Sequence, residues 1–215
     1  MLEWAGMNAQ DLLVAVQAEL APIERRLEGH RYLAEMEAGR VPVGSLRALA
    51  GEQRAIIASD QRSFEHLARR FPLPPAGQFF RDMAAGEAEA LGRLAAFGDA
   101  VGLSADYELL PGCQAYPAYV AWLALNGSPG DVALAFLANL ETWGRSCGRL
   151  RDALRPRLGP DAVSFFDFFA TPTPGFRDRA LELVATAEPG MARQAARLLQ
   201  AFELSFWDTL AEGFF

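Results

Sequence analysis

Apolar residues recur at helical spacing through most of the chain, and the alternation of apolar and polar residues typical of a strand is nearly absent. The first apolar stripe is formed by Leu12, Leu13, Val16, Leu20, Ile23 and Leu27. Segments rich in Gly and Pro interrupt the helical pattern at 39–44, 72–77, 109–117, 127–130, 157–162, 171–175 and 188–190. The pattern therefore predicts an all-α protein.

The positions of these breaks predict where the helices lie. After the first helix, we expect helices over 45–71, over 78–101, from the 109–117 turn to Asn126, from the 127–130 break to Leu154, and over 190–211. The connecting segments are short, which favours antiparallel neighbours in one bundle. We expect a single helical domain over 1–215.

Two polar residues interrupt the apolar stripe of the helix expected over 45–71. This stripe contains Leu46, Leu49, Ile56, Phe64, Leu67 and Phe71. Gln53 and Asp60 fall on the same stripe, seven residues apart, so both should point inward. Because a buried polar group without a partner costs about 1–3 kcal/mol, an inward position for both calls for a partner or a ligand.

Near the C-terminus, the segment AFELSFWDTL (201–210) places Glu203 among Phe202, Phe206 and Trp207. Burial would raise the pKa of this carboxyl group, which could then donate or accept a proton near neutral pH. The alternative is that Glu203 lies at the edge of an apolar stripe and reaches water.

Other helices carry similar polar groups. Glu141 lies beside Leu137 and Trp143, and Tyr116 and Tyr119 begin the short aromatic helix. A central pocket lined by aromatic and carboxyl side chains would explain all of these positions, whereas solvated helix edges would explain each one separately.

The composition excludes several classes of function. The net charge is −7, which argues against a surface that binds the phosphates of nucleic acid. Only two histidines are present, His30 and His66, too few for a metal site built from several His ligands. The two cysteines, Cys113 and Cys147, match no metal or redox spacing and are expected as buried thiols. We therefore expect no metal and no cofactor.

The location of the protein is also predicted from the sequence. The first ten residues show no signal-peptide pattern, and no stretch of transmembrane length is free of charge. We expect a cytoplasmic protein with no membrane partner.

Three segments together resemble a known family. The segment 29–53 has His30, Gly39 and Pro42 ahead of a helix, AYPAYVAWLALNG (115–127) is a Tyr-containing helix ended by Gly, and 203–207 reads Glu-x-x-Phe-Trp. In order and spacing they resemble the thiaminase II (TenA) family and its PqqC-like relatives, in the haem-oxygenase-like superfamily. The resemblance implies a multi-helix bundle around a central ligand pocket, in a protein that assembles as a dimer or tetramer.

The resemblance also implies roles for individual residues. The family hydrolyses C–N bonds of thiamin-derived aminopyrimidines, and its catalytic Glu corresponds to Glu203. A pocket Tyr corresponds to Tyr116, and the inward Asp of the second helix falls at Gln53. The nucleophilic Cys of the main subfamily falls near Asn139–Leu140, where this chain has no thiol, so Glu141 is a possible substitute. The further expected ligand-binding residues are Asp60, Tyr119, Trp143, Phe206, Trp207 and His30.

Three hypotheses follow. The first is a TenA-like enzyme that stacks a small heteroaromatic ring on its aromatic side chains and moves a proton with Glu203. In it, Tyr116 hydrogen-bonds that carboxyl and Glu141 assists an attacking water. The second is a non-catalytic ligand-binding or regulatory relative. The third is a PqqC-like or iron-dependent oxidase, which is disfavoured because the chain has only two histidines. An alternative role for His30 is to anchor the start of a helix.

Overall fold

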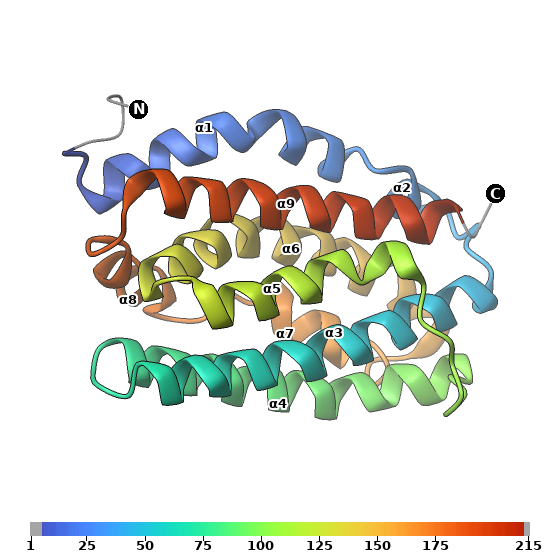
Figure 1. The fold of residues 1–215 in the computed structure, drawn as a ribbon. Coiled ribbons are helices and arrows are strands. Elements are labelled where there is room, and N and C mark those ends of the chain that lie inside the picture. The colour runs from blue at the N-terminus through green and yellow to red at the C-terminus, as the bar shows by residue number, and fades with distance from the viewer. Residues whose placement is uncertain (1–5, 213–215) are drawn as a thin grey trace.

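Five long helices lie side by side in the computed structural model, which describes residues 6–212 (Figure 1). They are α1 (Ala9–Glu28), α3 (Val43–Arg70), α4 (Ala76–Val101), α6 (Pro129–Leu158) and α9 (Pro189–Glu212). The shorter helices are α2 (Arg31–Glu37), α5 (Ala115–Asn126), α7 (Ser164–Ala170) and α8 (Phe176–Val184), with a 3₁₀ turn at Pro111–Cys113. No strand occurs within 6–212, so the all-α prediction is confirmed.

Most boundaries of the predicted helices fall within a few residues of the observed ones, but the short helices α2, α7 and α8 were not predicted. The helix α1 ends at Glu28 with Gly29 as its C-cap, and α2 begins immediately after His30. The His30 side chain accepts a hydrogen bond from the Tyr32 backbone N–H at 3.2 Å, which stabilises this new helix start. α6 continues to Leu158, past the predicted end at Leu154, with Pro156 in its last turn.

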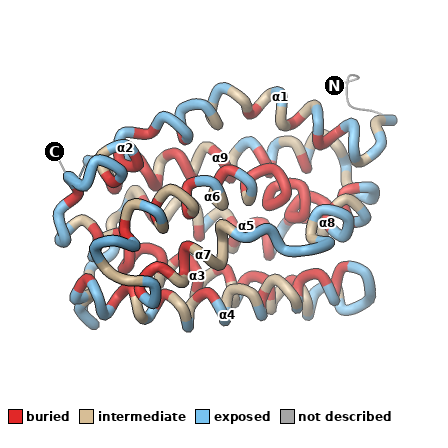
Figure 2. Tube along the Cα trace, turned by 180° about the vertical axis from the view of Figure 1, so that it is seen from behind, coloured by how far each residue is buried: buried red, intermediate tan, exposed pale blue. Residues whose placement is uncertain are grey.

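The helices are arranged around α6 and α9. α1 and α9 lie together at the top of Figure 1, α3 and α4 form an antiparallel pair at the bottom, and α5 and α6 lie between them. The buried positions of each helix face the interior of this bundle, as Figure 2 shows from the opposite side. Six of these helices surround the site described below.

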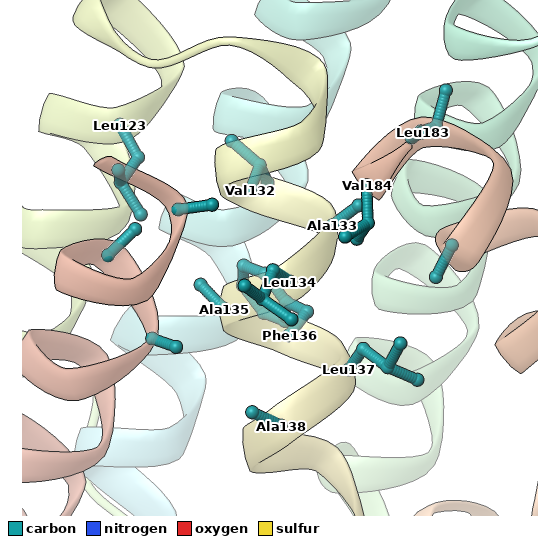
Figure 3. Close-up of a cluster of buried hydrophobic side chains, with 14 of the residues drawn as sticks. Leu123, Val132, Ala133, Leu134, Ala135, Phe136, Leu137, Ala138, Leu183 and Val184 are labelled. Atoms are coloured by element: carbon teal, nitrogen blue, oxygen red, sulfur yellow. The ribbon is translucent and has the colours of Figure 1, made fainter. Parts of the chain in front are cut away.

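The first half of α6 is buried on every side. Residues Val132 to Ala138 are all at most 8 % exposed. In Figure 3, Ala133 lies beside Val184 of α8, and Leu134 and Phe136 point into the cluster. A helix that is apolar all around is stable only when other helices cover all its faces, so α6 is the central element of the bundle.

A buried carboxylate on α3 holds the segment that leads from α4 into α5. Glu52 is 0 % exposed. It accepts hydrogen bonds from the Tyr107 hydroxyl at 2.8 Å, the Leu110 backbone N–H at 2.7 Å and the Gln114 amide at 2.9 Å. The neighbouring Gly51 makes room for Tyr107, since a Cβ at Gly51 would lie 2.3 Å from the Tyr107 ring. This anchoring fixes the start of α5.

Two smaller observations bear on the predictions. Both cysteines, Cys113 and Cys147, are buried free thiols. Among the helices of residues 6–212, none is long and apolar enough to cross a membrane.

Candidate functional site

A cavity of about 50 Å³ lies between α3, α4, α5, α6, α7 and α9. On α3, the residues that face it follow the i, i+3, i+4, i+7 spacing of one helix face, which explains why an apolar stripe located them. The lining residues are Gln53, Ile56, Ile57, Asp60, Glu87, Tyr116, Phe136, Asn139, Leu140, Trp143, Phe169, Glu203 and Phe206.

Glu203 is held in place by two side-chain donors. Its side chain is buried, with 3 % of the residue exposed. The Asn139 amide donates to Oε2, and the Trp207 indole N–H donates to Oε1 at 3.4 Å. Burial raises the pKa of Glu203 to about 7, although both hydrogen bonds act to lower it. A fixed carboxyl group with such a pKa can exchange a proton near neutral pH.

Two further carboxyl groups face the same cavity. Asp60 of α3 is 3 % exposed, and Glu87 comes from the adjacent α4. Among residues 6–212, Asp60 Oδ1 and Glu87 Oε2 are buried without a hydrogen-bond partner. Burial raises the pKa of Glu87 to about 8. Burial first, and then the charge of Glu87, raises the pKa of Asp60 well above its usual value.

Aromatic side chains form much of the remaining wall. Trp143 packs against Trp207 and Phe169, each with ring centroids 5.9 Å apart, and Phe206 packs edge-on against Trp207 at 5.2 Å. Burial, followed by the nearby carboxyl groups of Asp60, Glu203 and Glu87, raises the pKa of Tyr116 well above its usual value. Its hydroxyl group therefore stays protonated and can donate a hydrogen bond.

The structure brings most of the predicted site residues together. Glu203, Tyr116, Gln53, Asp60, Trp143 and Phe206 all line the cavity. Trp207 does not line it but supports Glu203 through the indole hydrogen bond. The predicted inward positions of Gln53 and Asp60 are confirmed by their burial.

The predicted inward position of Glu141 is wrong. Glu141 is exposed and forms an ion pair with Arg145 at 2.9 Å. On α6, Asn139 and Trp143 are four residues apart and share the face that lines the cavity. Glu141 lies two residues from each of them, which places it on the opposite side of the helix.

Tyr119 and His30 also lie outside the cavity. The Tyr119 ring stacks on Trp122, with centroids 5.7 Å apart, and packs edge-on against Phe202 at 5.3 Å. His30 begins α2, and its Nε2 lies 3.0 Å from Asp208 Oδ1. The alternative reading of His30 as a helix-start anchor is the one that the contacts support.

Seven cavity residues were not among the predicted site residues: Ile56, Ile57, Glu87, Phe136, Asn139, Leu140 and Phe169. Glu87 lies in the segment GEAEALGRLAA, where small residues on every face leave the inward side of α4 undefined. Asn139 and Leu140 stand near the position where the resemblance puts a nucleophilic thiol, and Asn139 instead orients Glu203. The nearer cysteine, Cys147, is fully buried, and burial followed by the charge of Glu203 raises the pKa of its thiol.

A larger groove of about 890 Å³ adjoins the cavity. It runs between α4, α6, α7 and the segment 171–179. Glu87, Phe136, Leu140 and Phe169 line both hollows, so their side chains form the wall between them. Among residues 6–212, no group of three or more His, Cys, Asp or Glu is placed to hold a metal ion.

Comparisons with known proteins agree with this architecture. No protein-family model and no curated protein sequence matches the chain. A TenA homologue from Pyrococcus furiosus superimposes with a TM-score of 0.76 at 18% identity, covering 93% of this chain and 99% of that one. A protein from a Silicibacter species, described as a TenA family transcription regulator, has a TM-score of 0.73 at 16% identity, covering 98% and 99%.

A third solved structure is a domain of unknown function with a haem-oxygenase-like fold from Shewanella denitrificans. Its TM-score is 0.77 at 13% identity, covering 97% of this chain and 94% of that one. At these identities the likeness shows the fold, which is the haem-oxygenase-like fold shared by TenA homologues.

Proposed function

We propose that the protein is a TenA-like enzyme that binds a small nitrogen heteroaromatic ligand and cleaves a C–N bond, with Glu203 as the acid and base. The observation that carries this proposal is the Glu203 carboxyl group, buried at an aromatic-walled cavity and oriented by Asn139 and Trp207. Its pKa of about 7 means that both protonation states are populated at neutral pH.

The reaction is a hydrolysis in which water supplies both product groups. Protonated Glu203 donates its proton to the leaving nitrogen as the C–N bond breaks. Water attacks the carbon atom, and the proton that it releases restores Glu203. Water takes the place of a thiol because Asn139 and Leu140 stand near the expected thiol position, and Cys147 does not line the cavity.

The size of the cavity limits how a ring can bind. An engineered protein cavity of about 150 Å³ binds benzene, and a single water needs about 10–15 Å³. At about 50 Å³, the cavity has room for a small polar head but not for a whole ring. The rest of the ligand therefore needs space in the adjoining groove, which it reaches when Leu140 and Phe169 change rotamer.

A second candidate is a non-catalytic ligand-binding or regulatory protein. The observation in its favour is that Asn139 replaces the thiol while the aromatic cavity is kept. This candidate predicts binding without turnover.

One experiment tests both candidates. The purified protein is incubated with thiamin and with amino-substituted pyrimidines, and both binding and C–N cleavage are measured. The enzyme proposal predicts cleavage that falls by at least about 100-fold in Glu203→Gln, with binding largely retained. The control is Glu182→Gln, an exposed residue of α8, which should react like the parent protein.

Cleavage that survives in Glu203→Gln would remove the role given to that residue. Binding without cleavage in the parent protein would favour the second candidate.

A further inference from the structure

Asp60 and Glu87 form a pair of carboxyl groups in the cavity that a contribution to folding does not explain. Asp60 Oδ1 and Glu87 Oε2 are buried and, among residues 6–212, accept no hydrogen bond. Carboxyl groups in such a position oppose folding, because desolvation is not offset by any donor. The cost is understandable if a ligand supplies the missing donors.

The same helix shows how a buried carboxylate is otherwise stabilised. Eight residues before Asp60, Glu52 is fully buried and accepts three hydrogen bonds from Tyr107, Leu110 and Gln114. Asp60 has no comparable set of donors and instead faces the cavity. The unsatisfied oxygens of the pair are therefore directed to a hollow that can hold a few non-hydrogen atoms.

We propose that Asp60 and Glu87 form a binding site for an organic cation with at least two N–H donors, such as an amidinium group, and that one proton leaves the pair as the cation enters. This proposal rests on the cavity as the ligand site, as in the proposed function, but it does not require C–N cleavage.

The charge balance gives the reason for proton release. A pair with both carboxyl groups protonated is neutral, and it can take up a monocation without leaving a net charge only by losing one proton. Burial raises the pKa of both groups, that of Glu87 to about 8, so the empty cavity favours their protonated, neutral forms. Binding then exchanges one proton for one cation, and the filled cavity carries no more charge than the empty one.

The groups that face the pair from the other helices do not supply a competing cation. Tyr116 of α5 and Glu203 of α9 are neutral or acidic, and α6 contributes the neutral Asn139. Of the arginines that line the groove, Arg179 is paired with Asp82 at 2.7 Å. Arg145 is paired with Glu141, and Arg151 with Asp152 and Asp167. Arg177 of the groove donates to the neutral Gln10.

Glu87 also defines the way in. It lines both the cavity and the groove, whereas Asp60 lines the cavity alone. A cationic head that arrives through the groove therefore meets Glu87 first and Asp60 behind it, while any larger substituent stays in the groove.

The test is titration calorimetry on the full chain with acetamidinium and benzamidinium at pH 7. Each titration is made in two buffers that differ in ionisation enthalpy, because the difference in heat counts the protons released. We expect both cations to bind, with close to one proton released for each, and at pH values below the pKa of the pair the affinity should rise roughly tenfold for each unit by which the pH increases. Neutral acetamide, of the same size as acetamidinium, should bind at least about tenfold more weakly.

Variants locate the site. Asp60→Asn and Glu87→Gln should each lower the affinity at least about tenfold, because each variant removes one of the two charged acceptors. The matched control is Asp99→Asn, which removes an exposed carboxyl group of the same helix that lines neither hollow and should leave the affinity and the proton release unchanged. Circular dichroism and a thermal melt check that each variant is folded, and we expect both cavity variants to be at least as stable as the parent protein.

Failure of either amidinium to bind, binding without proton release, or equal affinity in Glu87→Gln would each overturn the proposal. Glu203→Gln separates it from the proposed function, because that variant should lose cleavage but keep proton-linked binding.

Discussion

The pKa of Glu203 is set by burial and, in the opposite direction, by two hydrogen-bond donors. The hydrogen bonds from Asn139 and Trp207 lower its pKa, while burial raises it to about 7. Asn139→Ala removes one of these donors, so the pKa of Glu203 should rise further. The Trp207 indole N–H reports this, because its proton resonance should titrate with Glu203, with a midpoint that moves to higher pH in the variant. A midpoint that stays in place would contradict the role given to Asn139.

The acids of the cavity also make stability depend on pH. The pKa of Glu87 is about 8 in the folded protein against 4.5 for an ordinary Glu. Between these values the unfolded chain loses a proton that the folded protein keeps, so the free energy of unfolding should fall as pH rises through this window. Below pH 4.5 both states hold the proton, and the effect vanishes.

Glu87→Gln removes this dependence at one position. We expect the variant to be more stable than the parent protein near pH 8, by on the order of a few kcal/mol, and to differ little at pH 4. Urea unfolding across the pH range measures the difference. Glu89→Gln, at an exposed ion pair, should change stability by less than about 1 kcal/mol at any pH. Equal pH profiles for Glu87→Gln and the parent protein would show that Glu87 is not buried as described.

At the scale of elements, Gly51 lets α3 and the segment before α5 approach closely. Gly51→Ala would place a methyl group against the Tyr107 ring, whose hydroxyl donates to the buried Glu52. We expect a loss of about 1–3 kcal/mol, because displacing Tyr107 takes one donor from a buried carboxylate. Gly44→Ala in the same helix has open space around its Cβ and should be neutral or slightly stabilising. Chemical denaturation of the two variants provides the comparison.

Periodicity predicted the helices and the inward residues of α3, because a single clear stripe there contains both apolar and polar members. It failed on α6, where apolar residues surround the first half of the helix and the sequence does not define an inward face for Glu141. It failed on α4 for the opposite reason, since small residues leave the position of Glu87 ambiguous. Contacts between helices, and not the pattern within one helix, decide such positions.

The whole molecule holds two hollows that share a wall. Phe169 lines both of them, whereas its neighbour Phe168 lines the groove alone. Phe169→Ala should join the cavity to the groove and admit a flat ring, so indole should raise the melting temperature of this variant but not that of the parent protein. Phe168→Ala should show no such shift. Indole stabilisation of both variants alike would mean that Phe169 does not separate the hollows.

The fold class was within reach of the sequence, since helical spacing, short breaks and three family-like segments all indicate one architecture. The full lining of the cavity was not, because residues from six helices far apart in the chain contribute to it. The single domain over 1–215, the dimer or tetramer and the cytoplasmic location stay predictions, and size-exclusion chromatography with light scattering tests the second of them.

Glu52 and Asp60 are two buried carboxyl groups of α3 that differ in their hydrogen-bond donors. Glu52 accepts three hydrogen bonds from the chain, so a substitution at this position should lower the stability of the protein. Asp60 Oδ1 has no hydrogen-bond donor, so selection for thermostability alone should favour its replacement by an apolar residue, as in Asp60→Leu. Directed evolution for thermostability, run without any demand on ligand binding, should therefore erode the cavity at Asp60 and Glu87 while leaving Glu52 intact.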